Sequence, residues 1–166
     1  MTSSTAEQPS APPALTFSTR IWTALDLDRL YALLRLRAEV FVVEQNCAFQ
    51  DLDGYDRVAD HLLGEDCAGH LFAYARLLPP GAKYVEASIG RLVTAPSLRG
   101  TGVGRQLLAT ALRECQRRWP APVRIGAQQR LQRFYETFGF TVDGPPYLED
   151  GIRHVEMLLP PPGSLY

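Results

Sequence analysis

The sequence is poor in cysteine and has no long apolar segment. Its three cysteines, Cys47, Cys67 and Cys115, are an odd number without a Cys-x-x-Cys spacing, so neither a disulfide framework nor a metal site is expected. A reducing compartment, the cytoplasm, is the simplest prediction. No apolar run approaches the ~18 residues that a membrane-spanning helix needs. No apolar core precedes Arg20, the first basic residue, so no signal peptide is expected.

The chain also lacks an excess of charge of either sign. Its formal net charge is −1, so the whole chain has no basic footprint for nucleic acid. Basic residues nevertheless gather in one part of the sequence, where they would suit a polyanionic ligand. These residues are Arg99, Arg105, Arg113, Arg117, Arg118, Arg124, Arg130 and Arg133.

The length and the composition of the ends predict one domain with two tails. A chain of 166 residues is the size of a single domain. Residues 1–14 are rich in Ser, Thr, Ala and Pro and are predicted to be a disordered tail. Residues 15–159 are predicted to form the domain, and residues 160–166 a loose C-terminal tail.

Apolar periodicity and turn residues predict an alternation of strands and helices. Strands are predicted over residues 15–22, 58–63, 71–78, 85–94, 123–127, 140–142 and 152–159. Helices are predicted over residues 27–41, 103–119 and 130–138. Residues 44–57 read as an irregular loop or a broken helix. The strands ending at 94 and beginning at 123 should be parallel, because a helix crosses between them.

A glycine-rich turn stands between the strand at 85–94 and the longest helix. Gly100, Gly102 and Gly104 follow Pro96 and lead directly into the helix. The first amides of a helix have no internal partner and point where the helix dipole is positive. Glycines let a ligand approach this backbone closely. The turn therefore predicts a binding site for a phosphate or pyrophosphate.

Two common phosphate motifs do not fit this turn. The Gly-Lys-Ser/Thr ending of a P-loop is missing, and the spacing G-x-G-x-G is not that of a Rossmann fingerprint. Arg99, Gly102 and Gly104 instead resemble the acetyl-CoA motif of GNAT acetyltransferases, Arg/Gln-x-x-Gly-x-Gly/Ala. A glycine turn used only for helix packing is the alternative.

A second segment makes the resemblance specific. Residues 128–140, with Tyr135-Glu136-x-x-Gly139-Phe140 at their end, are similar to the GNAT segment in which an amide residue precedes a Tyr-Glu-x-x-Gly-Phe ending. Both motifs occur in the family's order and separation. Within GNATs, residues 40–47 and 147–154 look like the ElaA-like subfamily.

The resemblance implies a fold and a co-substrate. The fold is α/β, with a mixed, mostly antiparallel sheet of six to seven strands, helices on both faces and splayed central parallel strands. Acetyl-CoA would insert its pantetheine arm into the splay. The residues implied in binding it are Leu92, Val93 and Thr94 through their main chain, Arg99, Gly100, Thr101, Gly102, Val103 and Gly104 for the pyrophosphate, and Gln128 and Tyr135.

The implied reaction transfers an acetyl group to a primary amine by direct attack on the thioester. A backbone N–H near Val93 would polarise the thioester carbonyl. Tyr135 occupies the family's general-acid position, although a packed aromatic is the alternative. The family fixes no general base. The candidates are Glu44, His61, Glu149 and His154, each of which could instead be a structural or solvated residue.

The acceptor could be a small amine or a protein amine, and a homodimer is possible. Five acidic residues predict a negative rim that would attract a cationic amine. They are Asp51, Asp53, Asp56, Glu149 and Asp150.

Two other functions compete with this one. The first is a non-catalytic acyl-CoA-binding module. The second is a relative of acyl-homoserine-lactone synthases, because Arg37-x-x-Val40-Phe41 followed by Asp51, Asp53 and Asp56 is similar to that family's N-terminal pattern.

Overall fold

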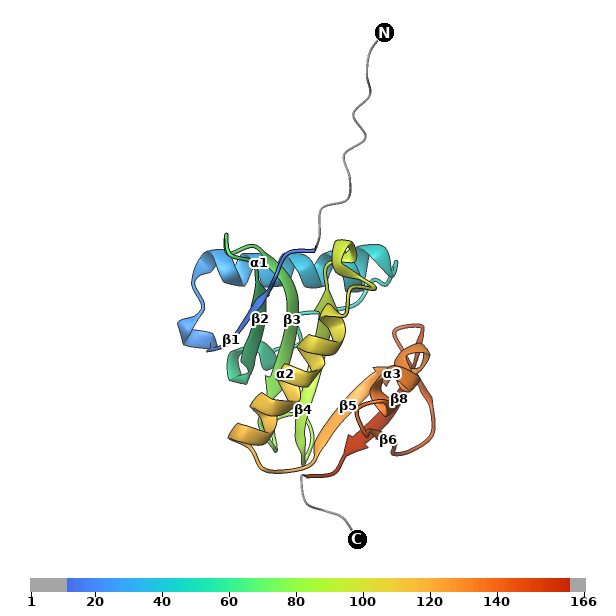
Figure 1. The fold of residues 1–166 in the computed structure, drawn as a ribbon. Coiled ribbons are helices and arrows are strands. Elements are labelled where there is room, and N and C mark those ends of the chain that lie inside the picture. The colour runs from blue at the N-terminus through green and yellow to red at the C-terminus, as the bar shows by residue number, and fades with distance from the viewer. Residues whose placement is uncertain (1–11, 162–166) are drawn as a thin grey trace.

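The computed structural model describes residues 12–161 and shows one sheet of eight strands between helices (Figure 1). Most of the predicted tails, residues 1–14 and 160–166, therefore lies outside the described residues. The strand order is β1-β2-β3-β4-β5-β8-β6, and β7 pairs with β8. The strands are β1 (Thr16–Ile21), β2 (Asp60–Glu65), β3 (Leu71–Leu78), β4 (Ala87–Thr94), β5 (Val123–Gln128), β6 (Thr141–Val142), β7 (Tyr147–Glu149) and β8 (Ile152–Leu159).

Helices cover both faces of the sheet. Helix α1 (Leu27–Arg37) packs on β3 and β4 through a cluster that includes Leu33, Leu36 and Tyr74. Helix α2 (Val103–Arg118) packs on the other face, where it shares a larger cluster with the short helix α3 (Gln132–Glu136). The apolar positions of α2 that recur every three or four residues are the buried ones, which is why this segment is an amphipathic helix.

The predicted α/β fold is confirmed, with local differences. The segment before β8 contains an additional short strand, β7, which forms a tight hairpin with β8. The predicted helix at 130–138 is a 3-10 turn, Gln129–Leu131, followed by the single α-helical stretch of α3. Helix α1 continues as a wider π-helical segment, Ala38–Glu44, beyond the predicted end. None of the helices formed by the described residues is long and apolar enough to cross a membrane.

The two parallel strands separate soon after they meet. The strands β4 and β5 pair only at Ala87 with Val123 and at Ser88 with Arg124. Beyond these pairs the strands diverge (Figure 1). The predicted splay is therefore present, and it opens a gap in the middle of the sheet.

A bulge lies on β4 beside this gap. Gly90 pairs with Arg76 and Val93 pairs with Tyr74, so two residues of β4 stand opposite one residue of β3. Arg91, one of the two, has a φ of 50°, a left-handed conformation that is uncommon outside glycine. A bulge of this kind redirects backbone and side-chain groups, and here they turn toward the gap.

Candidate active site

A cavity of about 600 Å³ occupies the gap between β4 and β5, within the usual range for a small-molecule site. It is bordered by the splayed strands, the π-helical segment, the loop after it, α3 and the β7–β8 hairpin. Its lining includes Val40, Phe41, Glu44, Gln45, Cys47, Phe49, Gln50, Asp53, Tyr55, Lys83, Ile89, Gly90, Arg91, Leu92, Val93, Thr94, Arg99, Gly104, Ile125, Gly126, Gln128, Arg130, Leu131, Phe134, Tyr135, Glu149, Asp150, Ile152 and His154.

Most of the residues predicted to bind the cofactor meet in this cavity. Seven of them line it: Leu92, Val93, Thr94, Arg99, Gly104, Gln128 and Tyr135. The other four, Gly100, Thr101, Gly102 and Val103, lie in the turn that leads into α2 and are not part of the lining.

The glycine turn has the backbone that its sequence predicts. Gly100 and Gly102 have φ values of 76° and 89°, which L side chains rarely adopt. The amides of Arg105 and Gln106 both donate to the Gly102 carbonyl, at 3.0 and 3.1 Å. The amides before them are the ones that a helix leaves without internal partners, and they are available to an anion.

One carboxylate lies beside this turn. Glu44 Oε2 accepts a hydrogen bond from Arg99 at 2.8 Å, and this hydrogen bond lowers the pKa of Glu44. Both side chains are partly exposed. The structure thus places Glu44, a candidate base, against the arginine predicted to bind phosphate.

Tyr135 lies at the inner wall of the cavity. Its side chain packs edge-on against Phe134 and Phe140, with ring centroids 5.2 and 5.9 Å away. Only 8% of Tyr135 is exposed, and this burial raises the pKa of its phenol to about 12. The phenol therefore keeps its proton throughout the neutral range.

Gln128 at the end of β5 connects two sides of the cavity. Its Nε2 donates to Gln45 Oε1 at 2.9 Å, and its Oε1 accepts from Arg130 Nε at 2.9 Å. Its side chain thus bridges β5 to the end of the π-helical segment. An amide at this position can exchange either contact for one to a ligand.

The β7–β8 hairpin forms the outer wall. Asp150 and Gly151 both have positive φ, 49° and 79°, as a two-residue turn of type I′ requires. The turn is joined to the opposite wall by Cys47 Sγ, which lies 3.3 Å from the Asp150 carbonyl. His154 Nε2 is 3.9 Å from Glu149 Oε2. These two candidate bases therefore line the cavity together.

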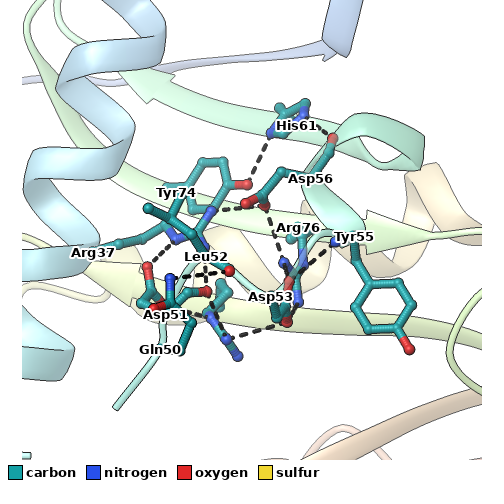
Figure 2. Close-up of polar contacts among 11 residues, drawn as sticks. Arg37, Gln50, Asp51, Leu52, Asp53, Tyr55, Asp56, His61, Tyr74 and Arg76 are labelled. Atoms are coloured by element: carbon teal, nitrogen blue, oxygen red, sulfur yellow. Dashed lines mark hydrogen bonds and ion pairs between the residues drawn. The ribbon is translucent and has the colours of Figure 1, made fainter. Parts of the chain in front are cut away.

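His61, the fourth candidate base, does not line the cavity. It is fully buried, with Nε2 2.9 Å from the Asp56 carbonyl and Nδ1 2.9 Å from Tyr74 Oη (Figure 2). A carbonyl only accepts, so Nε2 carries the proton and Nδ1 accepts from the phenol. Burial lowers the pKa of His61. The imidazole is a neutral structural group that supports the network described next.

Three arginines and three aspartates join the loop after the π-helical segment to the sheet and α1 (Figure 2). Arg37 binds Asp51 and Asp56, at 2.9 and 2.8 Å. Arg76 holds both carboxylate oxygens of Asp53 at 2.6 Å and reaches Asp56 at 3.0 Å. We call these residues, together with Arg91, the Arg–Asp network.

Arg91 ties the β4 bulge to the same loop. Its Nε donates to Asp51 Oδ1 at 2.6 Å, and its Nη2 donates to the Asp51 carbonyl at 3.0 Å. Asp53 Oδ2 lies 3.2 Å from the same Nη2. These contacts hold Arg91 in its left-handed conformation, and so they fix the bulge.

The Arg–Asp network corrects the predicted negative rim. Asp51, Asp53 and Asp56 are neutralised by arginines, and their side chains are only 11%, 23% and 8% exposed. Of the five predicted acids, only Glu149 and Asp150 remain as exposed charges. The sequence pattern showed the acids clearly, but the arginines that pair with them come from α1, β3 and β4.

The Arg–Asp network predicts how the stability of the protein changes as the pH falls. Burial alone would raise the pKa of Asp53, but its hydrogen bonds and charge pairing with Arg76 hold it at about 2, below the ordinary 3.8. A depressed pKa contributes stability above the unfolded value, and this is lost as the pH falls through the folded value. We therefore expect the free energy of unfolding to fall between about pH 4 and pH 2, as measured by urea titrations. Asp53→Asn should be less stable at neutral pH and show a smaller fall, and an unchanged fall would contradict the assignment.

A second polar cluster was missed at the sequence level. Glu156 on β8 stands opposite Gly126 on β5, and its Oε1 accepts from Tyr147 Oη at 2.7 Å and from Tyr84 Oη at 3.1 Å. The alternation of β8 is the available signal, since Val155 is buried in the apolar cluster and Glu156 must face the other way. Tyr84 comes from the β3–β4 loop and has no sequence signal.

Gly126 is the exposed floor beneath these oxygens. A Cβ built on it would lie 3.0 Å from Tyr147 Oη, 3.3 Å from Glu156 Oε1 and 3.5 Å from Tyr84 Oη. We call this space, bounded by Gly126, Tyr84, Tyr147 and Glu156, the Gly126 notch. Gly126, the floor of the notch, also lines the cavity, so the notch adjoins it.

A split sheet with a cavity in the gap, next to a glycine turn at a helix start, defines an acyl-CoA-dependent transferase. A family model described as acetyltransferase (GNAT) domain matches residues 58–160. The chain belongs to the GNAT acetyltransferase family.

Its relatives place it among ElaA-like members. The chain is 47% identical to the protein ElaA of Escherichia coli over 136 residues, which cover 80% of this chain and 88% of ElaA. The crystal structure of Escherichia coli ElaA matches with a TM-score of 0.81 at 42% identity, covering 87% of this chain and 98% of that one. An acyl-CoA N-acyltransferase from Pseudomonas aeruginosa matches with a TM-score of 0.82 at 42% identity and the same coverage.

The competing resemblance to acyl-homoserine-lactone synthases extends to the fold alone. A CoA-dependent synthase of that class matches with a TM-score of 0.74, covering 90% of this chain and 84% of that one. The identity is 18%. This match therefore shows a shared architecture and nothing about substrates.

Proposed function

We propose that the protein is an acetyl-CoA-dependent N-acetyltransferase that acts on a primary amine. The observation that carries this proposal is the gap between β4 and β5, which opens after two residue pairs and ends beside the glycine turn of α2. An extended pantetheine arm fits such a gap as an additional strand. The turn then meets the pyrophosphate with helix amides and Arg99.

The chain's own groups supply the chemistry that an amine and a thioester need. Arg91 and Leu92 form the bulge and lie between the β4 residues that pair with β3, so backbone groups near Val93 can face the thioester carbonyl. A fixed N–H donor there stabilises the oxyanion as the amine attacks. Tyr135 gives its proton to the departing thiolate. His154, Glu149 and Glu44 are the candidate bases that line the cavity.

The two faces of the sheet at the gap have different roles. Tyr135 packs in the apolar cluster on the α2 side of the sheet. Gly126 and Glu156 of the notch face the other side of β5 and β8, since Ile125, Val155 and Met157 occupy the α2 side. The donor therefore enters from the α2 side and the acceptor from the α1 side. A cytoplasmic location and a homodimer remain parts of the proposal.

The decisive test of the donor site is acetyl-CoA binding by Gly102→Glu. Gly102 has a φ of 89°, and a side chain there would have open space, so the added carboxylate would project at the start of α2 and repel the pyrophosphate. We expect calorimetry to show binding by the wild type and no measurable binding by the variant.

Gly69→Glu is the matched control. Gly69 lies in the β2–β3 turn with a φ of 84° and the same open space, so this variant carries equal backbone strain and charge. It should bind acetyl-CoA as the wild type does. Absence of binding by the wild type, or equal binding by Gly102→Glu, would reject the donor assignment.

A further inference from the structure

The Gly126 notch contains oxygens that can only accept hydrogen bonds. Both phenols donate their single proton to Glu156 Oε1. The lone pairs of Tyr84 Oη and Tyr147 Oη therefore remain, with those of the carboxylate. The three oxygens lie close together, each within 3.5 Å of the place that a Cβ on Gly126 would take. A group that fills the notch must bring donors.

The charge around the notch favours a cation. Arg124 is the nearest guanidinium, but it already binds Glu86 at 2.9 Å and Asp143 at 2.7 Å. Its distance to Glu156 Oε2 is 4.0 Å, and this oxygen is buried without a hydrogen bond to any of residues 12–161. The Arg124 guanidinium thus faces the carboxylates of Glu86, Asp143 and Glu156, so these four side chains together carry a net negative charge.

The neighbouring surface already carries a cation. Lys83, the only lysine of the chain, lies with its ammonium 5.2 Å from the centroid of the Tyr84 ring, as in a cation–π contact. The ring of one notch residue is thus already next to a positive charge. Glu149 and Asp150 at the outer wall add negative charge on the path into the cavity.

We propose that the Gly126 notch binds a primary ammonium group of the acceptor, through Tyr84 Oη, Tyr147 Oη and Glu156 Oε1. A primary ammonium has three N–H donors, which match three acceptor oxygens. Glycine at 126 leaves these oxygens uncovered, because a Cβ there would lie 3.0 Å from Tyr147 Oη and 3.3 Å from Glu156 Oε1. This inference rests on the proposed function and names its acceptor class. The ammonium is either the amine that becomes acetylated or a second amino group of a diamine.

The test measures amine binding directly by calorimetry, with butylamine and 1,4-diaminobutane as probes and butyrate as the anionic counterpart. We expect the wild type to bind the amines and not butyrate. Glu156→Gln keeps an oxygen for the two phenols but removes the charge, and should weaken amine binding on the order of ten- to a hundred-fold. Gly126→Ala should weaken binding by at least as much.

Two controls make the result specific. Glu65→Gln removes a carboxylate that pairs with Arg29 far from the cavity and should bind amines as the wild type does. Acetyl-CoA binding should be unchanged in Glu156→Gln, and thermal melting should show that both notch variants fold. Equal losses for both amines would identify the group as the reacting amine, whereas a loss for the diamine alone would identify it as a distal amino group.

Two results would contradict the proposed ammonium site. A wild type that binds neither amine, or a Glu156→Gln variant that binds both as tightly as the wild type, would overturn the ammonium site. In either case, acetyl-CoA binding by the wild type and its loss in Gly102→Glu would leave the proposed function standing. The two hypotheses therefore fail separately.

Discussion

Tyr135→Phe is expected to lower kcat by about 10²- to 10⁴-fold, the usual contribution of a positioned general acid. The change removes one oxygen and keeps the ring, so the packing against Phe134 and Phe140 is preserved. Binding of acetyl-CoA should change little. The loss should therefore appear in kcat and in kcat/KM for the amine, as measured by thiol release.

The pH profile sharpens this prediction. Because burial raises the pKa of Tyr135 to about 12, the phenol stays protonated at every pH below about 11. A limb of the wild-type profile below that pH must come from another group, such as the acceptor amine or the base. Tyr135→Phe should lower the whole profile without moving such a limb.

Tyr31→Phe is the matched control. Tyr31 is 71% exposed on α1, and the same loss of a hydroxyl there should leave kcat unchanged. Full turnover by Tyr135→Phe would remove the general-acid role and leave Tyr135 as a packing residue of the inner wall.

Arg37→Leu is expected to destabilise the protein by about 3–5 kcal/mol, the typical cost of leaving a buried charge without its partner. The Arg37 side chain is completely buried. It holds Asp51 and Asp56 at 2.9 and 2.8 Å. Its loss leaves the three carboxylates of the network to two arginines, so one buried negative charge is uncompensated. The free energy of unfolding from urea titrations at neutral pH measures the effect.

A surface ion pair provides the comparison. Arg29→Leu breaks contacts to Asp26 and Glu65, but the Arg29 side chain is 37% exposed, so its pairs contribute at most about 1 kcal/mol. A loss in Arg37→Leu no larger than that in Arg29→Leu would mean that solvent reaches the network. The double variant Arg37→Leu with Asp56→Leu should recover part of the loss, because the two remaining carboxylates are then matched by two arginines.

Most of the sheet could be predicted because its signals are local. Alternation and turn residues located β1, β3 and β8 nearly to the residue, and the helical spacing from Val103 onward located α2. The crossover between β4 and β5 predicted their parallel pairing, because handedness and chain length leave few choices. The π-helical segment was not predictable, since its apolar spacing does not differ visibly from that of an α-helix.

The site was predicted unevenly for a physical reason. Gly102, Tyr135 and Gln128 belong to contiguous motifs, so the sequence shows them. The Arg–Asp network joins residues separated by 14 to 40 positions, and the charge pairs that neutralise it exist only in the fold. Glu156 was overlooked because a single acid in a strand resembles an ordinary surface residue until Gly126 is seen opposite.

The two residue pairs between β4 and β5 have a mechanical consequence. The strands β1 to β4 form one wing and β5 to β8 another, and each wing is continuous in the sequence. Within residues 12–161 their backbones are joined by hydrogen bonds only at this short seam, and the other connections are α2 and side-chain contacts such as Gln128 with Gln45 and Tyr84 with Glu156. A ligand arm that hydrogen-bonds along the gap would complete the sheet and give the wings the continuous backbone connection that they lack.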